Sequence, residues 1–281
     1  MKSSSALVAI CGLMLSGAAH AGACCVGATS TVPTRLGECE GWLMGMGVQA
    51  ETTTGMWQSN GQLSQSSMTD DAIITTLAGA WRWDREGQLF ATLPMRLNHR
   101  AAGDLSELDG GVGDLRAGVI WDPIDEHASS WRPVPVLTLG ARLPTGRDWR
   151  DAERQLQTDV TGLTGTALIG VLTAERTMGR TPWSLGVDVE SGGGITAMGT
   201  TAVLGRYIGS QWSIISSLRH SRTITHTGSS TSRTNTGLRL TRGQPMRWRA
   251  WIGLDADVPV SGMGQGASRL AHASLGVALI R

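Results

Sequence analysis

The side chains best suited to chemistry in this sequence begin with a group of sulfur atoms near the N-terminus. Cys24, Cys25 and Cys39 lie close together, and Met44 and Met46 follow a few residues later. Thiolate and thioether ligands suit soft metals such as Cu(I). In an oxidising compartment a Cys24–Cys39 or Cys25–Cys39 disulfide with one thiol left over is the simpler expectation, and unpaired thiols are the third alternative. The disulfide is the preferred interpretation, and no metal site is predicted.

Two His-x-Ser pairs have the residue types of a general base and a nucleophile. They are His127 with Ser129 and His272 with Ser274. A hydrolytic site also needs a third side chain that orients the histidine. Asparagine, one residue type that can do this, is scarce, and the spacing places none beside either pair; the three are Asn60, Asn98 and Asn235. Because short His-x-Ser matches arise often by chance, we expect no catalytic residues and no enzymatic activity.

A third group of charged residues crowds the segment 145–158 and its C-terminal border. Its acidic members are Asp148, Asp151, Glu153 and Asp159, and Arg147, Arg150 and Arg154 are interleaved with them. A cluster of carboxylates is a possible calcium site, but mixed signs are more typical of a solvated loop that pairs with itself. The loop interpretation is preferred. The glycines at 192–194 sit in a strand connection and do not open a helix, so no phosphate-binding loop and no cofactor are predicted.

The elements that position these residues are read most clearly from 111–146. Leu115, Ala117, Val119 and Trp121 alternate with Asp114, Arg116 and Gly118, and the pattern repeats after a turn, with Leu137, Leu139, Ala141 and Leu143 against Thr138, Gly140 and Arg142. A period of two residues indicates β-strands. Large apolar side chains on one face and full charges on the other fit a barrel in lipid, whose outer face is apolar and whose lumen is wet.

This segment also resembles a known family. The pattern GxGDLxxGxxW, then a turn and a strand that closes in LPTG, is similar to the outer-membrane β-barrels of the meta-pathway of phenol degradation, which are transporter-like. The matching residues are Gly111, Gly113, Asp114, Leu115, Gly118 and Trp121, followed by Leu143, Pro144, Thr145 and Gly146. The match covers residues 110–190. The resemblance implies an outer-membrane barrel and a link to hydrophobic or aromatic compounds, and it identifies no catalytic site. The family also suggests an aromatic C-terminal residue, whereas this chain ends Leu279-Ile280-Arg281.

Composition excludes several classes of protein. Of 281 residues, 38 are glycine, about double the usual share, and only 17% are charged. A net charge of +1 lacks the basic surplus of a nucleic-acid-binding protein. Beyond the N-terminus no run of eighteen apolar residues occurs, so no transmembrane helix is predicted.

The N-terminus reads as an export signal. Lys2, an apolar segment from Ala6 to Leu15 and an Ala19-His20-Ala21 cleavage site predict a signal peptide over residues 1–21. A lipoprotein with Cys24 as the lipidated residue is the alternative. Residues 22–41 are then a short periplasmic lead-in that contains the cysteines, and 42–281 form the barrel.

Twelve alternating runs make up the predicted barrel, bounded by Gly, Pro, Asp and Ser. They are 42–57, 69–83, 88–100, 112–121, 132–144, 159–177, 183–191, 197–208, 211–224, 232–242, 246–258 and 268–281. Every second connection is short (84–87, 179–182, 209–210 and 243–245), apart from 122–131, and those between them are mostly longer and more polar. This rhythm is typical of outer-membrane barrels, with short periplasmic turns and longer outer loops. A secreted β-sandwich is the alternative fold.

The predicted fold is therefore all-β, an antiparallel up-and-down transmembrane β-barrel in the outer membrane of a Gram-negative bacterium. Its predicted function is passive uptake of small hydrophobic or aromatic solutes; the alternative is a structural or adhesion-type barrel with a plugged lumen and partner-binding loops. Expected partners are outer-membrane lipid, the solute and the barrel-assembly machinery, and the oligomeric state stays open. The lumen charges that would set selectivity are Arg96, Asp114, Arg116, Arg142, Asp188, Glu190, Arg239, Arg247, Arg249, Asp255 and Asp257.

Overall fold

The computed structural model of the protein describes most of the chain after its first 34 residues. The described residues are 35–36, 40–57, 63–64, 68–122, 132–226, 230–244, 247–258 and 267–281, and for 54, 56–57, 63–64, 231, 244, 255–258 and 267–271 the description covers the backbone alone. The predicted signal peptide (1–21), Cys24, Cys25 and Cys39, the His127–Ser129 pair and Asn60 lie outside the described residues.

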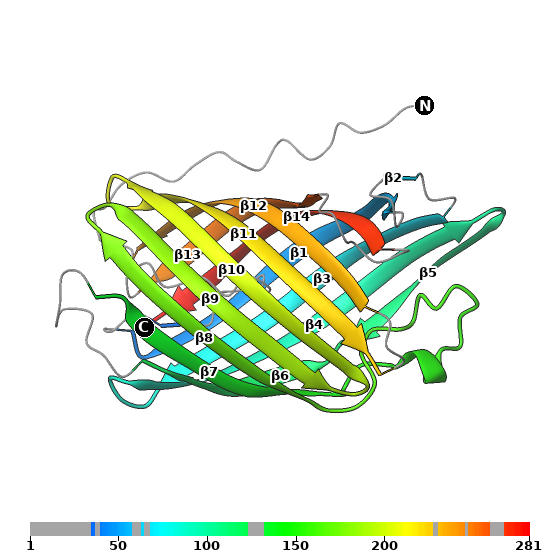
Figure 1. Ribbon diagram of the computed structural model, residues 1–281, viewed down its shortest axis with the longest axis horizontal. Helices are drawn as coiled ribbons and strands as arrows, with labels where there is room; N and C mark the ends of the chain where they lie inside the picture. Colours follow the sequence, from blue (N-terminus) through cyan, green and yellow to red (C-terminus); the bar gives the residue numbers. More distant parts are fainter. Residues whose placement is uncertain are drawn as a thin grey trace.

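The strands form a closed antiparallel barrel (Figure 1). Apart from β2 and β5, each strand pairs with the next one along the wall. The last strand, β14, pairs with the first, β1, from Leu43–Ile280 to Trp57–Ala267. Two strands, β5 and β6, both pair with β4 and together make one wall strand, while the two-residue β2 pairs only with β1. The barrel therefore has 12 strands, as the sequence predicts.

The bounds of the strands are close to those expected from the alternation. They are β1 (Trp42–Trp57), β2 (Leu63–Ser64), β3 (Met68–Arg82), β4 (Gly87–Ala102), β5 (Leu105–Val112), β6 (Leu115–Trp121), β7 (Val134–Leu143), β8 (Ala167–Met178), β9 (Thr181–Gly192), β10 (Ile195–Ile208), β11 (Trp212–Thr225), β12 (Ser230–Gln244), β13 (Trp248–Val258) and β14 (Ala267–Ile280). A single 3-10 turn, η2 (Trp149–Asp151), interrupts the loop before β8. Within the described ranges, no helix is long and apolar enough to cross a membrane.

Two predicted boundaries are wrong. The sixth run was expected to begin at 159, but β8 begins at Ala167, because the residues before it turn inward and bond to other elements. The connection 101–111 was expected to be an outer loop. Most of it is strand instead, with β4 and β5 joined by a two-residue turn in which Gly103 adopts φ +60°. The Gly- and Asp-rich end of β5 conceals its alternation in the sequence.

The connections define two ends of the barrel. Short turns at 83–86, 179–180 and 209–211 lie at one end with the C-terminus, and the long loop 144–166 and the β4–β5 hairpin lie at the other (Figure 1). Because outer-membrane barrels place short turns in the periplasm, we call these the periplasmic end and the outer end.

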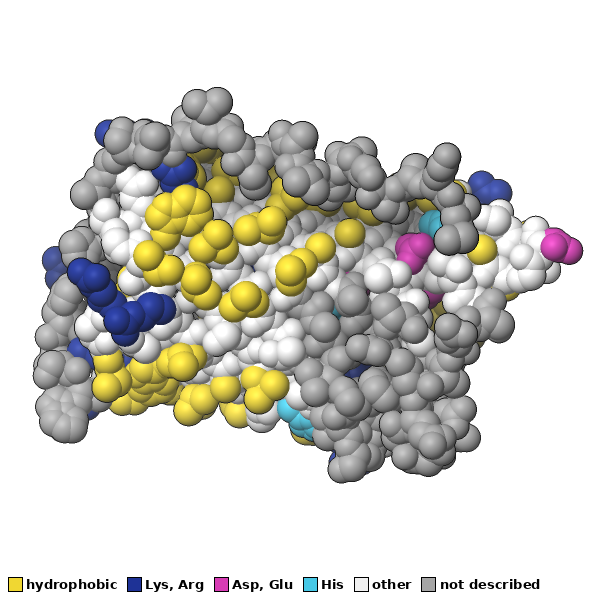
Figure 2. Space-filling model, turned by 90° about the horizontal axis from the view of Figure 1, so that it is seen from above, with side chains coloured by type: hydrophobic (Ala, Val, Ile, Leu, Met, Phe, Trp, Pro, Cys, Tyr) yellow, Lys and Arg dark blue, Asp and Glu magenta, His cyan; other side chains and the backbone are white. Residues whose placement is uncertain are grey.

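Figure 2 shows rows of apolar side chains along one face of the outside of the wall. Several predicted lipid-facing residues of β6, β7 and β9 are exposed, among them Trp121, Leu139, Leu185 and Val187, and the others are half-buried. A closed barrel with an apolar band of this kind is embedded in lipid, where the exposed leucine and valine side chains contact acyl chains instead of water. The fold and its apolar belt are those of an outer-membrane barrel of Gram-negative bacteria.

Tryptophans mark the periplasmic border of the belt. Trp81, Trp121 and Trp212 are exposed near the periplasmic ends of their strands. The guanidinium of Arg242 lies over two indole rings, 5.1 Å from the centroid of Trp212 and 5.9 Å from that of Trp248. Amphipathic rings and a cation of this kind fit the headgroup level of a membrane.

Candidate functional site

A network of charges lies inside the barrel near its outer end and is centred on Arg142. Its Nη1 donates to Asp114 Oδ2 (2.7 Å) and its Nε donates to Glu190 Oε1 (2.6 Å). Arg116 Nη2 donates to the other oxygen of Glu190 (3.1 Å). The Arg142 side chain is only 3% exposed. A buried charge is tolerated only when it is paired and hydrogen-bonded, and here two carboxylates flank the guanidinium.

Asp114, the aspartate of the GxGD pattern, also holds the long outer loop. Its Oδ1 accepts a hydrogen bond from the Gly146 amide (3.1 Å), and its Oδ2 accepts one from the Leu163 amide (2.8 Å). The two chain segments approach closely around this carboxylate: a Cβ on Gly146 would lie 2.8 Å from Cα of Gly162. Only glycine permits such close approach of two backbones. Asp114 therefore joins the wall to both ends of the loop.

The loop 144–166 is itself tied together by Asp159. Its Oδ2 accepts hydrogen bonds from the Glu153 amide (2.7 Å) and from Arg147 Nη1 (2.8 Å). Burial by itself would raise the pKa of Asp159, but the hydrogen bonds from the Glu153 amide and the Arg147 guanidinium outweigh burial and lower the pKa to about 2. The predicted interpretation of this segment as a loop that pairs with itself agrees with these contacts. Among the described residues, no three His, Cys, Asp or Glu side chains are grouped closely enough to hold a metal ion.

The loop turns into the barrel and contacts the inner face of β4. Asn98 Nδ2 donates to the carbonyl oxygens of Thr158 (2.7 Å) and Val160 (3.2 Å), and both Asn98 and Thr158 are fully buried. Arg100 Nη1 donates to the carbonyl of Leu156 (2.9 Å). Because these partners are on the wall of the lumen, the loop narrows the outer end of the barrel.

Two further groups of paired charges lie on the inner face of the wall. On β1 and β14, Glu51 lies 3.2 Å from Nδ1 of His272, and Arg96 Nη2 donates to Glu51 (3.3 Å). On β9 and β11, Arg219 Nη2 donates to Asp188 Oδ2 (2.8 Å). Each described pair joins residues from neighbouring or nearby strands, so charge is balanced locally along the wall.

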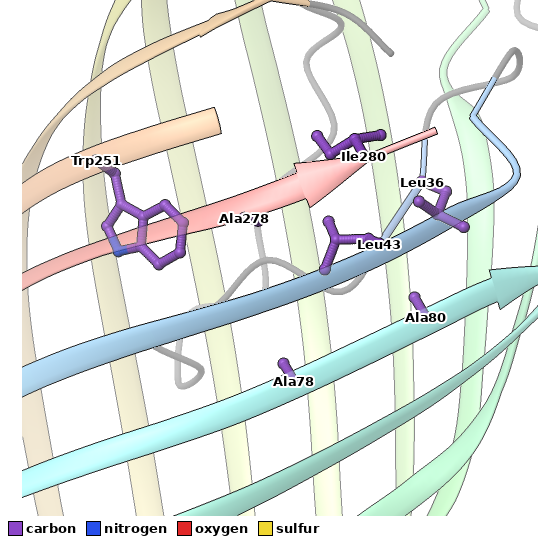
Figure 3. Close-up of a cluster of buried hydrophobic side chains, with 7 residues drawn as sticks. All are labelled: Leu36, Leu43, Ala78, Ala80, Trp251, Ala278 and Ile280. Carbon is purple, nitrogen blue, oxygen red and sulfur yellow. The ribbon is translucent and has the colours of Figure 1, made fainter. Parts of the chain in front are cut away.

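The periplasmic end is narrowed by residues that precede β1. Leu36 is fully buried inside the barrel with Leu43 and Trp251 in one apolar cluster (Figure 3). Both backbone polar groups of Leu36 are hydrogen-bonded. Its amide donates to Gln88 Oε1 (2.8 Å), and its carbonyl accepts from Arg82 Nη2 (2.8 Å). This short segment therefore enters the lumen.

Buried ion pairs flank the cluster around Leu36. Arg249 Nη2 donates to both oxygens of Glu40, at 2.5 and 2.6 Å. Arg35 donates to Asp122 (2.9 Å) and forms an ion pair with Glu175. The described part of the predicted lead-in thus contacts strands on several sides of the barrel.

Most predicted lumen residues lie on the inward face, although the sequence did not identify all of their partners. Arg96, Asp114, Arg116, Arg142, Asp188, Glu190, Arg239 and Arg249 are on that face, by register and by contact. Arg247 is exposed in the turn before β13 and does not lie within a strand. The backbone register puts Asp255 and Asp257 on the same face, but their side chains are outside the description.

Sequence reasoning missed Glu51, Arg219, Arg35 and Glu40. Strict alternation predicts the inward face for Glu51 and Arg219, so their positions were available from the pattern. The partners of Arg35 and Glu40 come from strands distant in sequence, and no local signal identifies them. His272 and Ser274 both point inward; His272 contacts Glu51 and Gln49, so this His-x-Ser pair does not face lipid.

Comparisons with known proteins identify the fold. No family model matches the chain, and no curated protein matches it. An outer membrane channel from Pseudomonas putida F1 is similar in structure, with a TM-score of 0.69 and 14% identity over 91% of this chain and 98% of that one. The translocator domain of the autotransporter NalP from Neisseria meningitidis is similar with a TM-score of 0.52 and 12% identity over 85% of this chain and 88% of that one. At these identities the similarity shows the outer-membrane β-barrel fold; neither of these two structures is described as an enzyme.

Proposed function

We propose that the protein is a passive outer-membrane channel for small hydrophobic or aromatic solutes. The solute would cross by diffusion down its own gradient, without energy coupling. The observation that carries the proposal is that separate segments, and not the wall itself, narrow the two ends of the lumen. Loop 144–166 does so at the outer end, and the residues around Leu36 do so at the periplasmic end.

Barrel size supports this interpretation. Eight strands enclose a space that side chains can fill, whereas sixteen or more leave an aqueous channel. A barrel of 12 strands lies between these cases. Its lumen is too wide for wall side chains alone to fill. Loop 144–166 and the segment around Leu36 occupy part of it, and a limited set of side-chain contacts holds them there. A rearrangement of the loop or of the N-terminal segment would therefore open a path.

The solute class is supported by the motif and by the lining of the lumen. The pattern from Gly111 to Gly146 resembles barrels associated with phenol degradation. Arg116, whose side chain is 38% exposed, presents its guanidinium plane beside Glu190. Guanidinium planes stack on aromatic rings while their edges bind hydroxyl or carboxyl groups. We propose that the inward charges named above set selectivity among such solutes.

A structural or adhesion-type barrel is the second candidate. The observation that favours it is the set of Arg–carboxylate pairs at the outer end, in the middle and at the periplasmic end of the lumen. If these pairs never separate, the lumen stays closed and the loops carry the function.

Liposome swelling with Asp114→Asn distinguishes the two. Asp114 and Glu190 both bond Arg142, but only Asp114 accepts hydrogen bonds from the loop amides. We expect Asp114→Asn to raise the swelling rate with phenol-sized solutes several-fold over wild type, and the matched control Glu190→Gln to have a smaller effect. Swelling rates that stay at the protein-free level for wild type and both variants would reject the channel and favour the structural barrel.

A further inference from the structure

Three polar side chains gather on the outside of the barrel, among the apolar residues of the wall. Asp71, His99 and Ser106 come from β3, β4 and β5, three strands that are neighbours in the sheet. Asp71 and His99 are directly paired, and Ser106 pairs with Ala101, one step further along the same face. The side chains of Asp71 and His99 are 43% and 42% exposed, so the group is accessible from outside the barrel.

The order of contacts is that of an acid, a base and a nucleophile. His99 Nε2 lies 3.2 Å from Ser106 Oγ, and His99 Nδ1 lies 3.8 Å from Asp71 Oδ2. Each ring nitrogen therefore has its own partner, with the carboxylate on one side and the hydroxyl on the other, as in hydrolytic triads. Catalytic hydrogen bonds are often long before substrate binds. Thr52 Oγ1 also donates to Asp71 Oδ1 (2.6 Å), which holds the carboxylate in place.

The group lies at the outer border of the membrane. Exposed Trp81 marks the periplasmic border on the same strand, β3. About ten residues separate Trp81 from Asp71, which is roughly 33 Å of strand, and a tilt of about 35–45° makes this roughly 25 Å along the membrane normal. An apolar band of a barrel is about 25 Å tall. Asp71 therefore lies where hydrocarbon meets the headgroups, which is the depth of the ester bonds that attach acyl chains.

An apolar groove of about 600 Å³ runs past this group. Ile73, Leu97 and Leu254 line it together with small residues such as Ala50 and Ala273. Asp71 and His99 are part of its lining. A groove of this size and polarity fits an acyl chain, and Ser106 lies next to its wall through the contact with His99.

A second His–Ser pair on β11 and β12 provides a comparison within the same barrel. His220 and Ser232 also face outward, and the hydroxyl lies 3.2 Å from His220 Nε2, the same distance as in the first pair. On the other ring nitrogen, His220 Nδ1 has the hydroxyl of Thr234 at 2.8 Å. A hydroxyl in that position cannot stabilise an imidazolium as a carboxylate does. The two sites thus differ in the partner of the histidine Nδ1, which is the Asp71 carboxylate in the first and the Thr234 hydroxyl in the second.

We propose that Ser106, His99 and Asp71 form a hydrolytic site for the acyl ester bonds of lipids in the outer leaflet. Ser106 Oγ attacks the ester carbonyl carbon while its proton passes to His99 Nε2. The bond to the alcohol oxygen breaks, and that oxygen takes the proton from His99, which leaves an acyl-Ser106 ester and the freed alcohol. A water molecule then gives a proton to His99 and its oxygen attacks the acyl carbon. Ser106 Oγ leaves with the proton, and a fatty acid is released.

Two readouts on the purified full-length protein in detergent micelles test the proposal. The first is labelling by a fluorophosphonate, with the modified residue located by mass spectrometry. The second is fatty-acid release, measured in separate arms with phosphatidylethanolamine and with lipopolysaccharide, since both carry acyl esters. The variants are Ser106→Ala, His99→Asn and Asp71→Asn, with Ser232→Ala as the matched control. A heat-shifted band on an unboiled gel shows that each variant is folded.

We expect Ser106 to be labelled and Ser232 to be unlabelled. Ser106→Ala should abolish labelling and reduce release to the protein-free rate, and His99→Asn should lower release by about 10²–10⁴-fold. Ser232→Ala should match wild type, and release in one arm identifies the lipid. Fatty-acid release that is absent from both arms, or equal in wild type and folded Ser106→Ala, would overturn the proposal. Because Ser106 is on the outer face, Ser106→Ala should leave liposome swelling unchanged, which separates this test from that of the channel.

Discussion

At the scale of single residues, each charged side chain described inside the barrel in an ion pair has its partner close in space, although the two are often distant in sequence. Arg249 and Glu40 are both about 6% exposed, and their bidentate contact joins the segment before β1 to β13. A buried pair of this kind adds little net stability over an apolar pair, but it is costly to break, because the remaining charge stays buried. The same reasoning applies to Arg142 between Asp114 and Glu190.

Glu40→Gln is predicted to destabilise the barrel strongly. It leaves the charge of Arg249 without its carboxylate, and the loss of one partner of a buried pair costs about 3–5 kcal/mol. Urea unfolding in lipid vesicles, followed by tryptophan fluorescence, measures the change. The matched control is Glu153→Gln, whose exposed carboxylate also faces an arginine, Arg147, at 3.5 Å; exposed pairs contribute about 0–1 kcal/mol. Equal effects of the two substitutions would contradict the prediction.

The long loop is predicted to stay tied at mildly acidic pH and to loosen only in strong acid. The pKa of Asp159 is lowered from 3.8 to about 2. A carboxyl with a depressed pKa contributes stability above its unfolded value, and this contribution is lost as the pH falls towards the folded value. The transition should therefore lie between about pH 4 and pH 2. A fluorophore on Gln155→Cys, in a variant with the other cysteines replaced by serine, reports the loosening.

Asp159→Asn provides the control for this titration. The amide carries no negative charge and only one acceptor oxygen, so it binds Arg147 and the Glu153 amide more weakly. The labelled loop should therefore be loose already at neutral pH. A transition in the parent protein above pH 5, or one that Asp159→Asn leaves intact, would show that another group ties the loop.

At the scale of elements, strict alternation divides each strand between lipid and lumen. On β11, Leu218 is 50% exposed on the outer face, whereas its neighbours Ser217 and Arg219 point inward. Because paired residues of neighbouring strands share a face, the register of the sheet maintains this division from strand to strand. A slip of one residue would carry charged side chains such as Arg219 into lipid. The alternation therefore excludes one-residue slips of the register.

Leu218→Arg is predicted to destabilise the barrel because it puts a charge in the apolar belt. An arginine near the middle of the membrane costs about 2–4 kcal/mol. Unfolding in phospholipid vesicles measures this cost, and Leu218→Met, which keeps the volume and polarity of the side chain, serves as the control. If Leu218→Arg were as stable as Leu218→Met, Leu218 would not face hydrocarbon.

At the scale of the whole molecule, closure of β14 on β1 leaves no wall edge unpaired along most of its length. In lipid an unpaired backbone group has no water to bond, so a closed barrel resists partial unfolding. Closure brings the two ends of the barrel sequence together: the Arg281 amide donates to the Trp42 carbonyl (3.0 Å), and the Trp42 amide donates to the Arg281 carbonyl (2.9 Å).

The folded protein should therefore fractionate with outer membranes and migrate differently on a gel before and after boiling. Detergent at room temperature does not open a closed barrel, whereas heat does, so the unboiled band should be shifted. A change of β14 that breaks its pairing, such as Gly276→Pro, removes a ladder hydrogen bond from a wall strand and should abolish the shift. A soluble protein with no heat-dependent band would contradict the fold.

The sequence by itself determined the class of fold, the number of strands and the two faces of the wall. A period of two residues and a one-sided distribution of charge follow from the backbone geometry of a strand and from the difference between lipid and water. These causes act on each strand separately, so they can be read locally. The predicted bounds failed where local composition misleads, as in the Gly- and Asp-rich β5 and in the residues 159–166, which bend inward.

The tertiary structure decided which side chains meet. Asp114 could be recognised as part of a motif, but its hydrogen bonds to the Gly146 and Leu163 amides depend on how the loop folds back. The entry of Leu36 into the lumen and the grouping of Asp71, His99 and Ser106 depend on contacts between segments far apart in the chain. The physical reason is that alternation specifies a face for each residue, while the shear of the closed barrel and the path of its loops specify its neighbours.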